Sequence, residues 1–256
     1  MDALPPASAR GEGPLLRVAG LSRAFGGVRA VQDLSFSVEH DEILGLVGPN
    51  GSGKTTVFNL IAGTLRPDAG EIYLAGRRIT ADPPSLRSAL GIARTFQLVR
   101  VLGGLTALEN VLVAALYGRR RAPTLPAARG QAARLLEVVG LAAKAGAPSG
   151  ALTLAERRRL EIARALATAP RLLLLDEPIG GLNPAEGDAM LALFQRIRGD
   201  GVAVILVEHN VRAVRAVCDR VLVLNSGHKI AEGRADEALA QPQVAEVYLG
   251  THASAR

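Results

Sequence analysis

A lysine and a threonine at the end of a glycine-rich segment could bind phosphate and a metal ion. The segment GPNGSGKTT runs from Gly48 to Thr56, after the apolar run EILGLV and before the helix-forming run VFNLIAG. A glycine-rich turn in that context points backbone N–H groups at one centre, and the helix start adds its positive dipole end. The Lys54 ammonium would neutralise the β- and γ-phosphates of a nucleotide, and the Thr55 hydroxyl would bind Mg²⁺. The residues predicted to bind this triphosphate are Gly48, Pro49, Asn50, Gly51, Ser52, Gly53, Lys54, Thr55 and Thr56.

Four polar side chains follow other predicted strands. Asp176 and Glu177 end the run LLLLDEP, His209 follows VAVILVE, and Gln97 follows IARTF. Because ligands bind at the carboxyl ends of parallel strands, these groups should lie beside the phosphate loop. Asp176 suits the Mg²⁺ shell, and Glu177 suits the general base that polarises an attacking water. His209 could donate an N–H to the γ-phosphate, and Gln97 could offer its amide oxygen to the metal or the water.

The elements that must position these residues indicate an α/β fold, because short β-type runs alternate with helical runs. The runs LLLLDEP and VAVILVEH are uniformly apolar, as in strands buried on both faces. From Thr106 to Gly150 the apolar residues follow helical spacing only, which predicts helices inserted into the core. The stretch RRRAPTLP, Arg119–Pro126, is predicted as the loop between them. The predicted strands are Leu16–Val18, Val31–Val38, Ile43–Val47, Glu71–Leu74, Ile92–Phe96, Leu172–Leu175, Val202–Val207 and Val221–Leu224.

The composition is that of a globular protein. The chain has 256 residues, of which 48% are hydrophobic and 21% charged, so it can bury a substantial core. No apolar run approaches the roughly 18 residues needed to cross a bilayer. The single cysteine, Cys218, excludes an internal disulfide and is predicted to be buried. The net charge of +6 is mostly arginine, and with 3% aromatic residues a nucleic-acid groove is weakly supported. Residues 1–14 are predicted to be a disordered leader on a cytoplasmic protein.

The motifs occur in an order that resembles the ATP-binding subunits of ABC transporters. The ordered set is GPNGSGKTT, GIARTFQ, LTLAERRRLEIARAL, LLLLDEP, GGLNP and VEHN. The resemblance is closest to the importers of branched-chain and related hydrophobic amino acids, on GIARTFQ, its spacing to TALENVLVAAL, and the terminal VYLG. It implies a P-loop NTPase (RecA-like) core with an antiparallel β-subdomain and an inserted α-helical subdomain. The implied single domain covers residues 15–250, with the helical subdomain at about 98–168 and a flexible tail at 251–256.

The resemblance also implies how two subunits act together. They would pack head to tail, with each ATP between the phosphate loop of one chain and the signature motif of the other. Gln97 would connect the Mg²⁺ site to the helical subdomain, Glu177 would be the general base, and His209 the switch histidine. Phe25, in RAFGG, would stack on adenine. The implied signature motif is Leu152, Thr153, Leu154, Ala155 and Glu156, and the implied D-loop is Gly181, Leu182 and Asn183.

The implied cofactors are ATP and Mg²⁺, and the implied partners form a transporter. They are a sister ATPase or a second copy, two membrane permease subunits and an extracytoplasmic solute-binding protein, at the cytoplasmic face of the inner membrane. ATP-driven closure would move the helical subdomain against the permease, and nucleic acid is not expected as a partner. One alternative is the ATPase subunit of a lipid or lipopolysaccharide exporter, which also shows short acidic-ended signatures. A soluble ABC ATPase acting on nucleic acid usually carries long coiled-coil insertions or tandem cassettes, which this chain lacks.

The signature stretch LTLAE departs from the family pattern, L-S-G-G-Q or a tyrosine-containing variant. Thr153 keeps a hydroxyl and can cap the following helix. Ala155 replaces a glycine, and its Cβ would be costly if its φ were positive. Glu156 favours the helix start but would place a carboxylate near ATP. The hypothesis is that the chain hydrolyses ATP, while the site completed by its LTLAE is slower.

Overall fold

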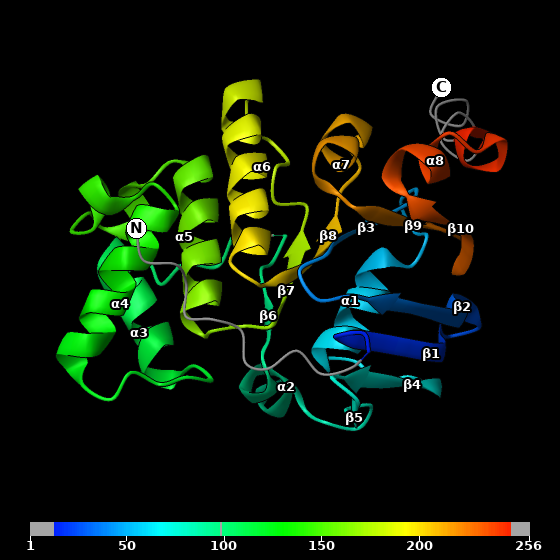
Figure 1. The fold of residues 1–256 in the computed structure, drawn as a ribbon, viewed down its shortest axis with the longest axis horizontal. Helices are drawn as coiled ribbons and strands as arrows, with labels where there is room; N and C mark the ends of the chain where they lie inside the picture. Colours follow the sequence, from blue (N-terminus) through cyan, green and yellow to red (C-terminus); the bar gives the residue numbers. More distant parts are fainter. Residues whose placement is uncertain (1–12, 98, 247–256) are drawn as a thin grey trace.

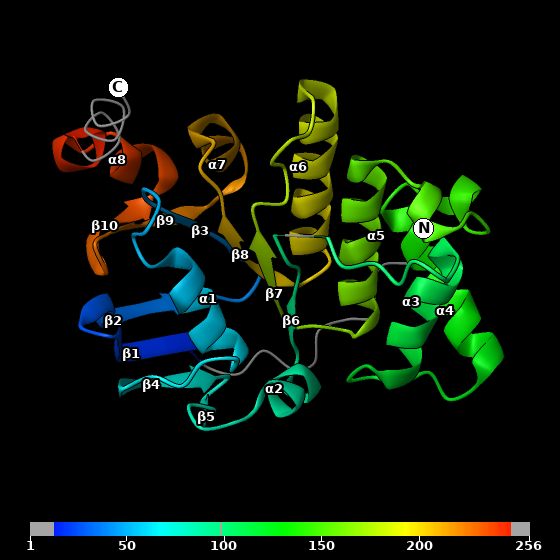
Figure 2. The ribbon, with the colours of Figure 1, turned by 180° about the vertical axis from the view of Figure 1, so that it is seen from behind.

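The computed structural model describes residues 13–97 and 99–246. The predicted leader, apart from residues 13 and 14, and the predicted tail lie outside the described residues. The described chain forms two sheets, helices that cover the larger sheet, and a group of helices at one end of the molecule (Figures 1 and 2). None of the helices in this part of the chain combines the length and the hydropathy that a bilayer span requires.

The larger sheet carries the strands that end in polar residues. Its strand order is β10–β9–β3–β8–β7–β6, and neighbouring strands are parallel except for the antiparallel pair β9–β10. Consecutive parallel strands are joined through helices, so their carboxyl ends share one edge of the sheet. The strands are β3 (Ile43–Val47), β6 (Ile92–Arg94), β7 (Leu172–Asp176), β8 (Ala203–Val207), β9 (Arg220–Asn225) and β10 (His228–Arg234).

A smaller antiparallel sheet, of order β2–β1–β4–β5, packs near α1 on one side of the larger sheet (Figure 1). Its longest pair, β1 with β2, contains register shifts that bend the ribbon. The strands are β1 (Leu16–Phe25), β2 (Val28–Val38), β4 (Ala69–Leu74) and β5 (Arg77–Arg78). The helices flanking the two sheets are α1 (Lys54–Ala62), α2 (Pro84–Leu90), α6 (Pro184–Gly199), α7 (Val211–Val217) and α8 (Ala235–Leu239).

The remaining helices form what we call the helical segment, which lies at the end of the molecule opposite the smaller sheet (Figures 1 and 2). It comprises α3 (Ala107–Tyr117), α4 (Leu125–Val138), α5 (Leu154–Ala167) and two 3₁₀ turns, Ala142–Lys144 and Ser149–Ala151. Both α3 and α5 begin with a capping box, in which a threonine side chain and a glutamate three residues later satisfy each other's backbone N–H groups. In both views α5 lies between α4 and α6, so it joins the helical segment to the core.

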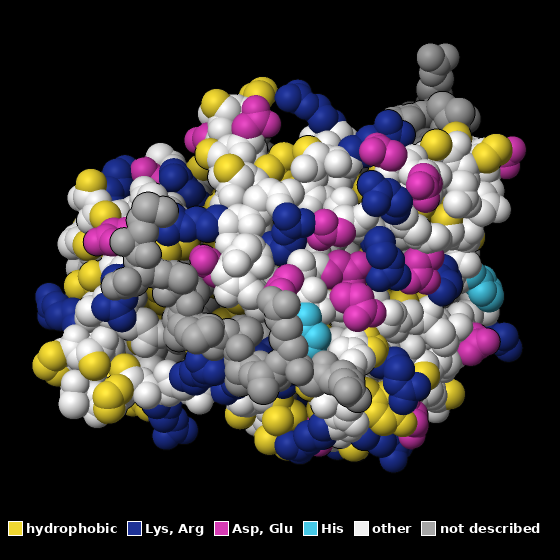
Figure 3. All heavy atoms as spheres, in the orientation of Figure 1, with side chains coloured by type: hydrophobic (Ala, Val, Ile, Leu, Met, Phe, Trp, Pro, Cys, Tyr) yellow, Lys and Arg dark blue, Asp and Glu magenta, His cyan; other side chains and the backbone are white. Residues whose placement is uncertain are grey.

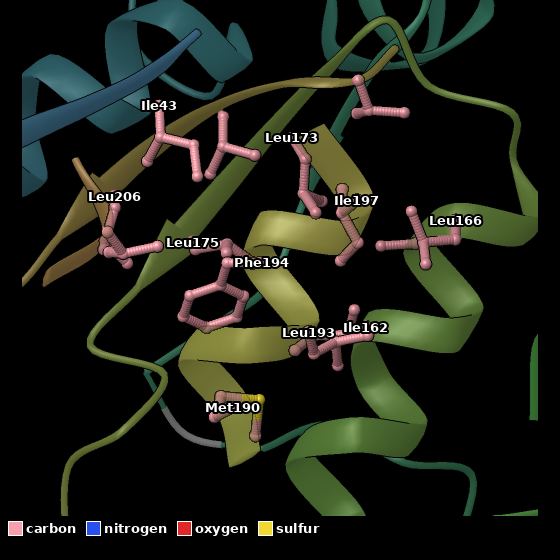
Figure 4. Close-up of a cluster of buried hydrophobic side chains, with 14 of the residues drawn as sticks. Ile43, Ile162, Leu166, Leu173, Leu175, Met190, Leu193, Phe194, Ile197 and Leu206 are labelled. Atoms are coloured by element: carbon pink, nitrogen blue, oxygen red, sulfur yellow. The ribbon is translucent and has the colours of Figure 1, made fainter. Parts of the chain in front are cut away.

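The apolar core lies on both faces of the larger sheet. Strands β3, β7 and β8 are buried along their whole length. Successive side chains point to opposite faces, so Leu173 and Leu175 pack in one cluster, whereas Leu172 and Leu174 pack in the other. Figure 4 shows part of the first cluster, where Phe194 of α6 packs near Leu175 and the other labelled side chains come from the sheet, α5 and α6. Burial on both faces is the reason for the uniformly apolar runs.

The structure confirms most predicted elements and corrects several boundaries. Each predicted strand overlaps an observed one, but Ile92–Phe96 is too long, because β6 ends at Arg94. The short β5 and the edge strand β10 were not predicted, since neither has an apolar run. The prediction of helix without strands for Thr106–Gly150 is confirmed, because the elements of this stretch are α3, α4 and the two 3₁₀ turns. The predicted loop Arg119–Pro126 is also too long, because α4 starts at Leu125 and carries Pro126 in its first turn.

The predicted burial of Cys218 is confirmed, and burial raises the pKa of its thiol. Charged groups, in contrast, are spread over the surface. On the face shown in Figure 3, Lys and Arg side chains are interspersed with Asp and Glu side chains. Among the described residues of this face, the positive charge is therefore distributed rather than gathered in one basic patch.

Candidate functional site

Strand register brings the predicted site residues to one edge of the larger sheet. Leu46 of β3 pairs with Val207 of β8, and Val207 pairs with Asp176 of β7. The three strands therefore end at the same level, and the N–H of Glu177 donates to the Val207 carbonyl oxygen at 2.9 Å. The phosphate loop follows β3, Glu177 follows β7, and His209 lies two residues after β8. The predicted convergence of these loops is confirmed.

Two glycines of the phosphate loop occupy positions that admit no side chain. A Cβ at Gly48 would lie 2.1 Å from the Leu224 carbonyl oxygen, and one at Gly53 would lie 2.2 Å from the Ala30 carbonyl oxygen. Both residues have positive φ angles, of 147° and 105°, which L-amino acids with side chains rarely adopt. The loop is thus held by backbone contacts with β9 and β2. Alanine at either position would displace the neighbouring strand.

The interior of the loop is suited to an anion. No side chain caps the N-terminus of α1, which starts at Lys54, and its first turn contains no acidic residue. The first N–H groups of a helix lack intrahelical partners, so they remain available to phosphate oxygens. The Ser52 hydroxyl is buried without a hydrogen-bond partner. The Lys54 ammonium folds over the loop and donates to the carbonyl oxygens of Gly48, at 2.7 Å, and Pro49, at 2.8 Å. The free N–H groups of the helix start, the unpartnered Ser52 hydroxyl and the nearby Lys54 ammonium fit a triphosphate.

The electrostatic balance of the site depends on Lys54, Asp176 and Glu177. Burial lowers the pKa of Lys54, while the two carboxylates raise it. Burial also raises the pKa of Asp176, and the Arg94 guanidinium, 3.5 Å from its carboxylate, lowers it. Asp176 is buried, and the charges of Arg94, Glu177 and Lys54 act on its carboxylate. A divalent cation at this carboxylate would add to the charge that Arg94 and Lys54 already supply.

Oxygen atoms available here match the preference of Mg²⁺. Thr55 is exposed at the start of α1, Asp176 ends β7, and Gln97 lies three residues after β6. Hydroxyl, carboxylate and amide oxygens are hard ligands of the kind that Mg²⁺ takes, usually together with substrate phosphates. In the described ranges, no group of three His, Cys, Asp or Glu side chains could hold a metal ion by itself. The residues therefore fit a magnesium ion that completes its shell with phosphate oxygens.

Gln97 and Glu177 are brought into direct contact. The Gln97 amide Nε2 donates to Glu177 Oε2 at 3.3 Å, so the loops after β6 and β7 meet above the sheet edge. The prediction concerned the amide oxygen of Gln97, as a ligand of metal or water. The observed hydrogen bond uses the amide nitrogen of the same group, so the oxygen is not engaged by this contact. His209 is exposed on the adjacent loop.

Phe25 lies at the end of β1, where it pairs with Val28 across the turn to β2. Its ring is 42% exposed and the Arg23 guanidinium lies 4.9 Å from its centroid. The same strand β2 contributes Ala30, whose carbonyl contacts the Gly53 position. The Phe25 side chain therefore belongs to the β1–β2 pair, which borders the phosphate loop through Ala30.

The signature stretch forms the first turn of α5 rather than an irregular loop. Thr153 is the N-cap, its hydroxyl accepts from the Glu156 N–H at 3.3 Å, and the Glu156 carboxylate accepts from the Thr153 N–H at 3.0 Å. Ala155 does not have a positive φ angle, because it lies within α5. Its side chain is 3% exposed. Its Cβ packs inward, while Leu154 is 39% exposed. Glu156 also forms an ion pair with Lys144 at 2.6 Å, which partly neutralises its carboxylate.

The predicted D-loop lies next to this turn. Gly181 has a φ of 76°, and the Leu154 Cδ2 is 3.5 Å from where its Cβ would be. Leu182 is half-buried, and Asn183 caps α6 through a hydrogen bond from the Glu186 N–H at 2.9 Å. The signature turn and the D-loop therefore form one continuous surface of the chain.

Sequence reasoning missed a polar clamp on the loop that carries Glu177. The Arg158 guanidinium of α5 donates to the Glu177 carbonyl oxygen and, at 2.7 Å, to the Gly180 carbonyl oxygen. From the other side, Glu208 accepts from the Ile179 N–H at 3.0 Å, and this carboxylate is only 1% exposed. Glu177 itself has a φ of 47°, which costs about 1–3 kcal/mol for a residue with a side chain. The clamp holds this strained residue in place.

A second buried carboxylate, Glu161, holds the loop that carries Gln97. Its Oε1 accepts from the N–H groups of Phe96, at 3.2 Å, and Arg100, at 3.5 Å, which lie on either side of Gln97. The Arg164 guanidinium donates to the Arg100 carbonyl oxygen. Burial raises the pKa of Glu161 in spite of these N–H donors. The available signal was spacing, because Arg158, Glu161 and Arg164 recur every three residues along α5, and from Leu160 onward its other positions are apolar.

Comparison with known proteins agrees with this geometry. The family model described as ABC transporter matches residues 31–180. The high-affinity branched-chain amino acid transport ATP-binding protein BraF of Pseudomonas aeruginosa is 39% identical over 250 residues, covering 93% of this chain and 98% of that protein. The corresponding protein LivG of Escherichia coli strain K12 is 37% identical, with the same two coverages.

Solved structures show the same fold. A nucleotide-free ATP-binding cassette from an ABC transporter superposes with a TM-score of 0.83 at 30% identity, over 92% of this chain and 99% of that one. The ADP conformation of an ATP-binding cassette of an ABC transporter superposes with a TM-score of 0.84 at 31% identity, over 93% and 99%. With phosphate loop, paired carboxylates and capped signature helix all in place, the chain belongs to the ABC transporter family, as one of its ATP-binding cassettes.

Proposed function

We propose that this cassette hydrolyses MgATP to drive the import of branched-chain or related amino acids through partner permeases. The observation that carries the proposal is the convergence of three loops at one sheet edge: the loop that leads to Lys54 at an uncapped helix start, the loop of Glu177 and the loop of His209. The names of the relatives, which are branched-chain amino acid transport proteins, support the substrate class. They favour an importer over a lipid exporter or an ATPase acting on nucleic acid.

In the proposed reaction the phosphate loop binds the triphosphate, and Phe25 stacks on adenine. Thr55, Asp176 and Gln97 would hold Mg²⁺, which would neutralise charge on the β- and γ-phosphates. The Glu177 carboxylate takes a proton from the attacking water as its oxygen bonds to the γ-phosphorus. The bond from that phosphorus to the bridging oxygen breaks, and the electron pair stays with ADP. Lys54 balances the charge on the leaving group, and His209 donates an N–H to the γ-phosphate.

We further propose that two cassettes act together. The surface formed by the first turn of α5 and the D-loop would cover the nucleotide of the partner, which is a second copy or a sister ATPase. The exposure of Leu154 and of Gly181 beside it supports this assignment, because both are available to a partner. A relative at 26% identity, with a TM-score of 0.76, was solved as a dimer bound to ADP and Pi.

The permease would dock in a groove between the core and the helical segment. This groove has a volume of about 480 Å³ and is lined in part by Phe96, Arg100 and Leu102. Phe96 is exposed, with the Arg94 and Arg100 guanidinium groups at 5.0 Å and 4.7 Å from its ring centroid. An apolar helix end of a permease could pack on that ring. The groove borders the loop of Gln97, so a docked permease could act on Glu177 through the contact between these two residues. The cassette would lie at the cytoplasmic face of the membrane, and a solute-binding protein would lie on the opposite side.

Two substitutions test the proposed hydrolysis. Glu177→Gln should retain ATP binding and abolish turnover, because the amide cannot accept the proton of the attacking water. Lys54→Ala should weaken nucleotide binding itself. Fluorescent ATP titration measures binding, and phosphate release measures turnover. Turnover at the wild-type rate in Glu177→Gln would remove Glu177 from the role of base. Leucine uptake by vesicles containing the cassette and its co-purifying permeases tests the substrate class.

A further inference from the structure

A cavity of about 610 Å³ lies between the helical segment and the core, away from the nucleotide site. The α3–α4 connection and α4 contribute Arg119, Arg121 and Arg134 to one wall. The core contributes Arg196 of α6 and Pro170, which precedes β7. The far end of β7 carries Asp176. At about 3.3 Å per strand residue, roughly 20 Å separates the cavity from that carboxylate.

The cavity carries more positive than negative charge, because five arginines line it (Arg119, Arg120, Arg121, Arg134 and Arg196) beside the carboxylate of Asp200. Within the described ranges, Arg119, Arg121, Arg134 and Arg196 form no ion pair with an Asp or Glu side chain. The Nε of Arg119 donates to the Ala169 carbonyl oxygen at 3.0 Å. Burial lowers the pKa of this guanidinium, and the neighbouring charges of Arg120 and Arg171 lower it further. Like charges held together repel one another, so a bound anion would stabilise this arrangement.

Part of the cavity wall is apolar. Leu135 of α4, Leu166 of α5 and Val202 are buried and line it, and Val138 is partly buried beside them. A purely inorganic anion would leave this apolar surface in contact with water. A ligand that combines an anionic group with an apolar part would cover both.

We propose that this cavity binds an organic phosphate, with phosphate oxygens on Arg121, Arg134 and Arg196 and the apolar part against Leu135 and Leu166. Guanidinium groups match phosphate oxygens through paired N–H donors. The volume falls within the range of about 300–1,000 Å³ typical of small-molecule sites. The phosphate belongs either to a free metabolite or to the headgroup of an anionic phospholipid, and both share this chemistry.

A ligand in this cavity would affect how the helical segment sits on the core, and this consequence rests on the proposed function. Arg134 belongs to the helical segment and Arg196 to the core, so an anion between them connects the two parts. If transport moves the helical segment against the core, the ligand favours the arrangement that it binds more tightly. Binding itself does not depend on hydrolysis, and it is testable in a protein whose phosphate loop is disabled.

The test uses the full chain carrying Lys54→Ala, so that the phosphate loop does not dominate the measurement. Calorimetric titration with phenyl phosphate, which carries both a phosphate group and an apolar ring, probes the free source. Co-sedimentation with phosphatidylglycerol-containing vesicles, against pure phosphatidylcholine vesicles, probes the lipid source. Arg134→Glu and Arg196→Glu are added singly, and Arg129→Glu serves as control, because it makes the same charge change on an exposed position of α4 outside the cavity. Thermal denaturation verifies folding of each variant.

At least one probe should bind, and Arg134→Glu and Arg196→Glu should each weaken it about tenfold or more. Arg129→Glu should leave the affinity within about twofold. Binding of phenyl phosphate alone identifies a free organic phosphate, and vesicle binding alone identifies a lipid headgroup. Failure of both probes with folded protein, or an equal loss in Arg129→Glu, overturns the proposal. Retained ATP turnover in Lys54→Ala would count against the proposed function and would leave this site untouched.

Discussion

Replacing Arg158 by methionine should slow turnover without weakening ATP binding. Methionine retains the apolar stem but removes both N–H donors that bind the carbonyl oxygens of Glu177 and Gly180. Glu177 then loses a restraint on its left-handed backbone conformation, and its carboxylate moves away from the position of the attacking water. The neighbouring Glu208, buried at 1% exposure, loses a positive charge.

The magnitude follows from the lost bonds. Hydrogen bonds that involve a charged group contribute about 1.5–3 kcal/mol each, and the lower value applies because Arg158 is only partly buried. The two bonds therefore amount to about 3 kcal/mol. If half or all of this restraint is needed in the transition state, kcat falls about ten- to hundredfold. The KM for ATP should change little, because Arg158 does not contact the phosphate loop.

Steady-state phosphate release by the purified protein measures kcat and KM. Arg159→Met is the matched control, since it makes the same change at the next position of α5, whose side chain does not contact the Glu177 loop. Thermal denaturation shows whether a lower rate reflects unfolding. Equal kcat values for Arg158→Met and Arg159→Met would refute the reasoning, as would a loss confined to KM.

Three further predictions concern buried carboxylates and the signature turn. Glu161→Ala should lower kcat about tenfold by freeing the loop of Gln97, and Glu161→Gln, which keeps an acceptor oxygen, should recover much of it in the same phosphate-release assay. Burial raises the folded-state pKa of Glu208 above its unfolded value, so the folded protein binds more protons and loses stability as pH rises through that pKa. Glu208 faces Arg158, His209 and Glu177, and urea unfolding of Glu208→Gln should show a weaker loss of stability than wild type as pH rises above the ordinary glutamate pKa of 4.5, whereas parallel curves would contradict this. Ala155→Gly should destabilise the protein by about 1 kcal/mol in thermal unfolding, because Ala155 is a buried helical residue, and it should not raise the ATPase rate. A higher ATPase rate in this variant would show that the Cβ of Ala155 hinders the reaction.

The sequence by itself determined the chemistry of the phosphate loop and the order of its partners. Gly48 to Thr56 form a phosphate loop wherever a strand precedes and a helix follows, because backbone N–H groups supply the contacts. Runs such as LLLLDEP predict a strand buried on both faces, so the carboxylates at its end had to lie at the ligand-binding edge. The position of Thr153 before an acidic residue three places later likewise predicts a helix start.

Only the tertiary structure decided how the loops are held. Strand order is set by long-range pairing, and the contact between Gln97 and Glu177, 80 residues apart, depends on β6 lying beside β7. The sequence does not give the partners of Arg158 and Glu161, because spacing alone does not show which carbonyl or N–H a side chain reaches. Whether Ala155 was strained also depended on its φ angle, which a single residue type does not specify. Local patterns encode backbone preferences, whereas the partners of a buried charge are fixed by packing between distant segments.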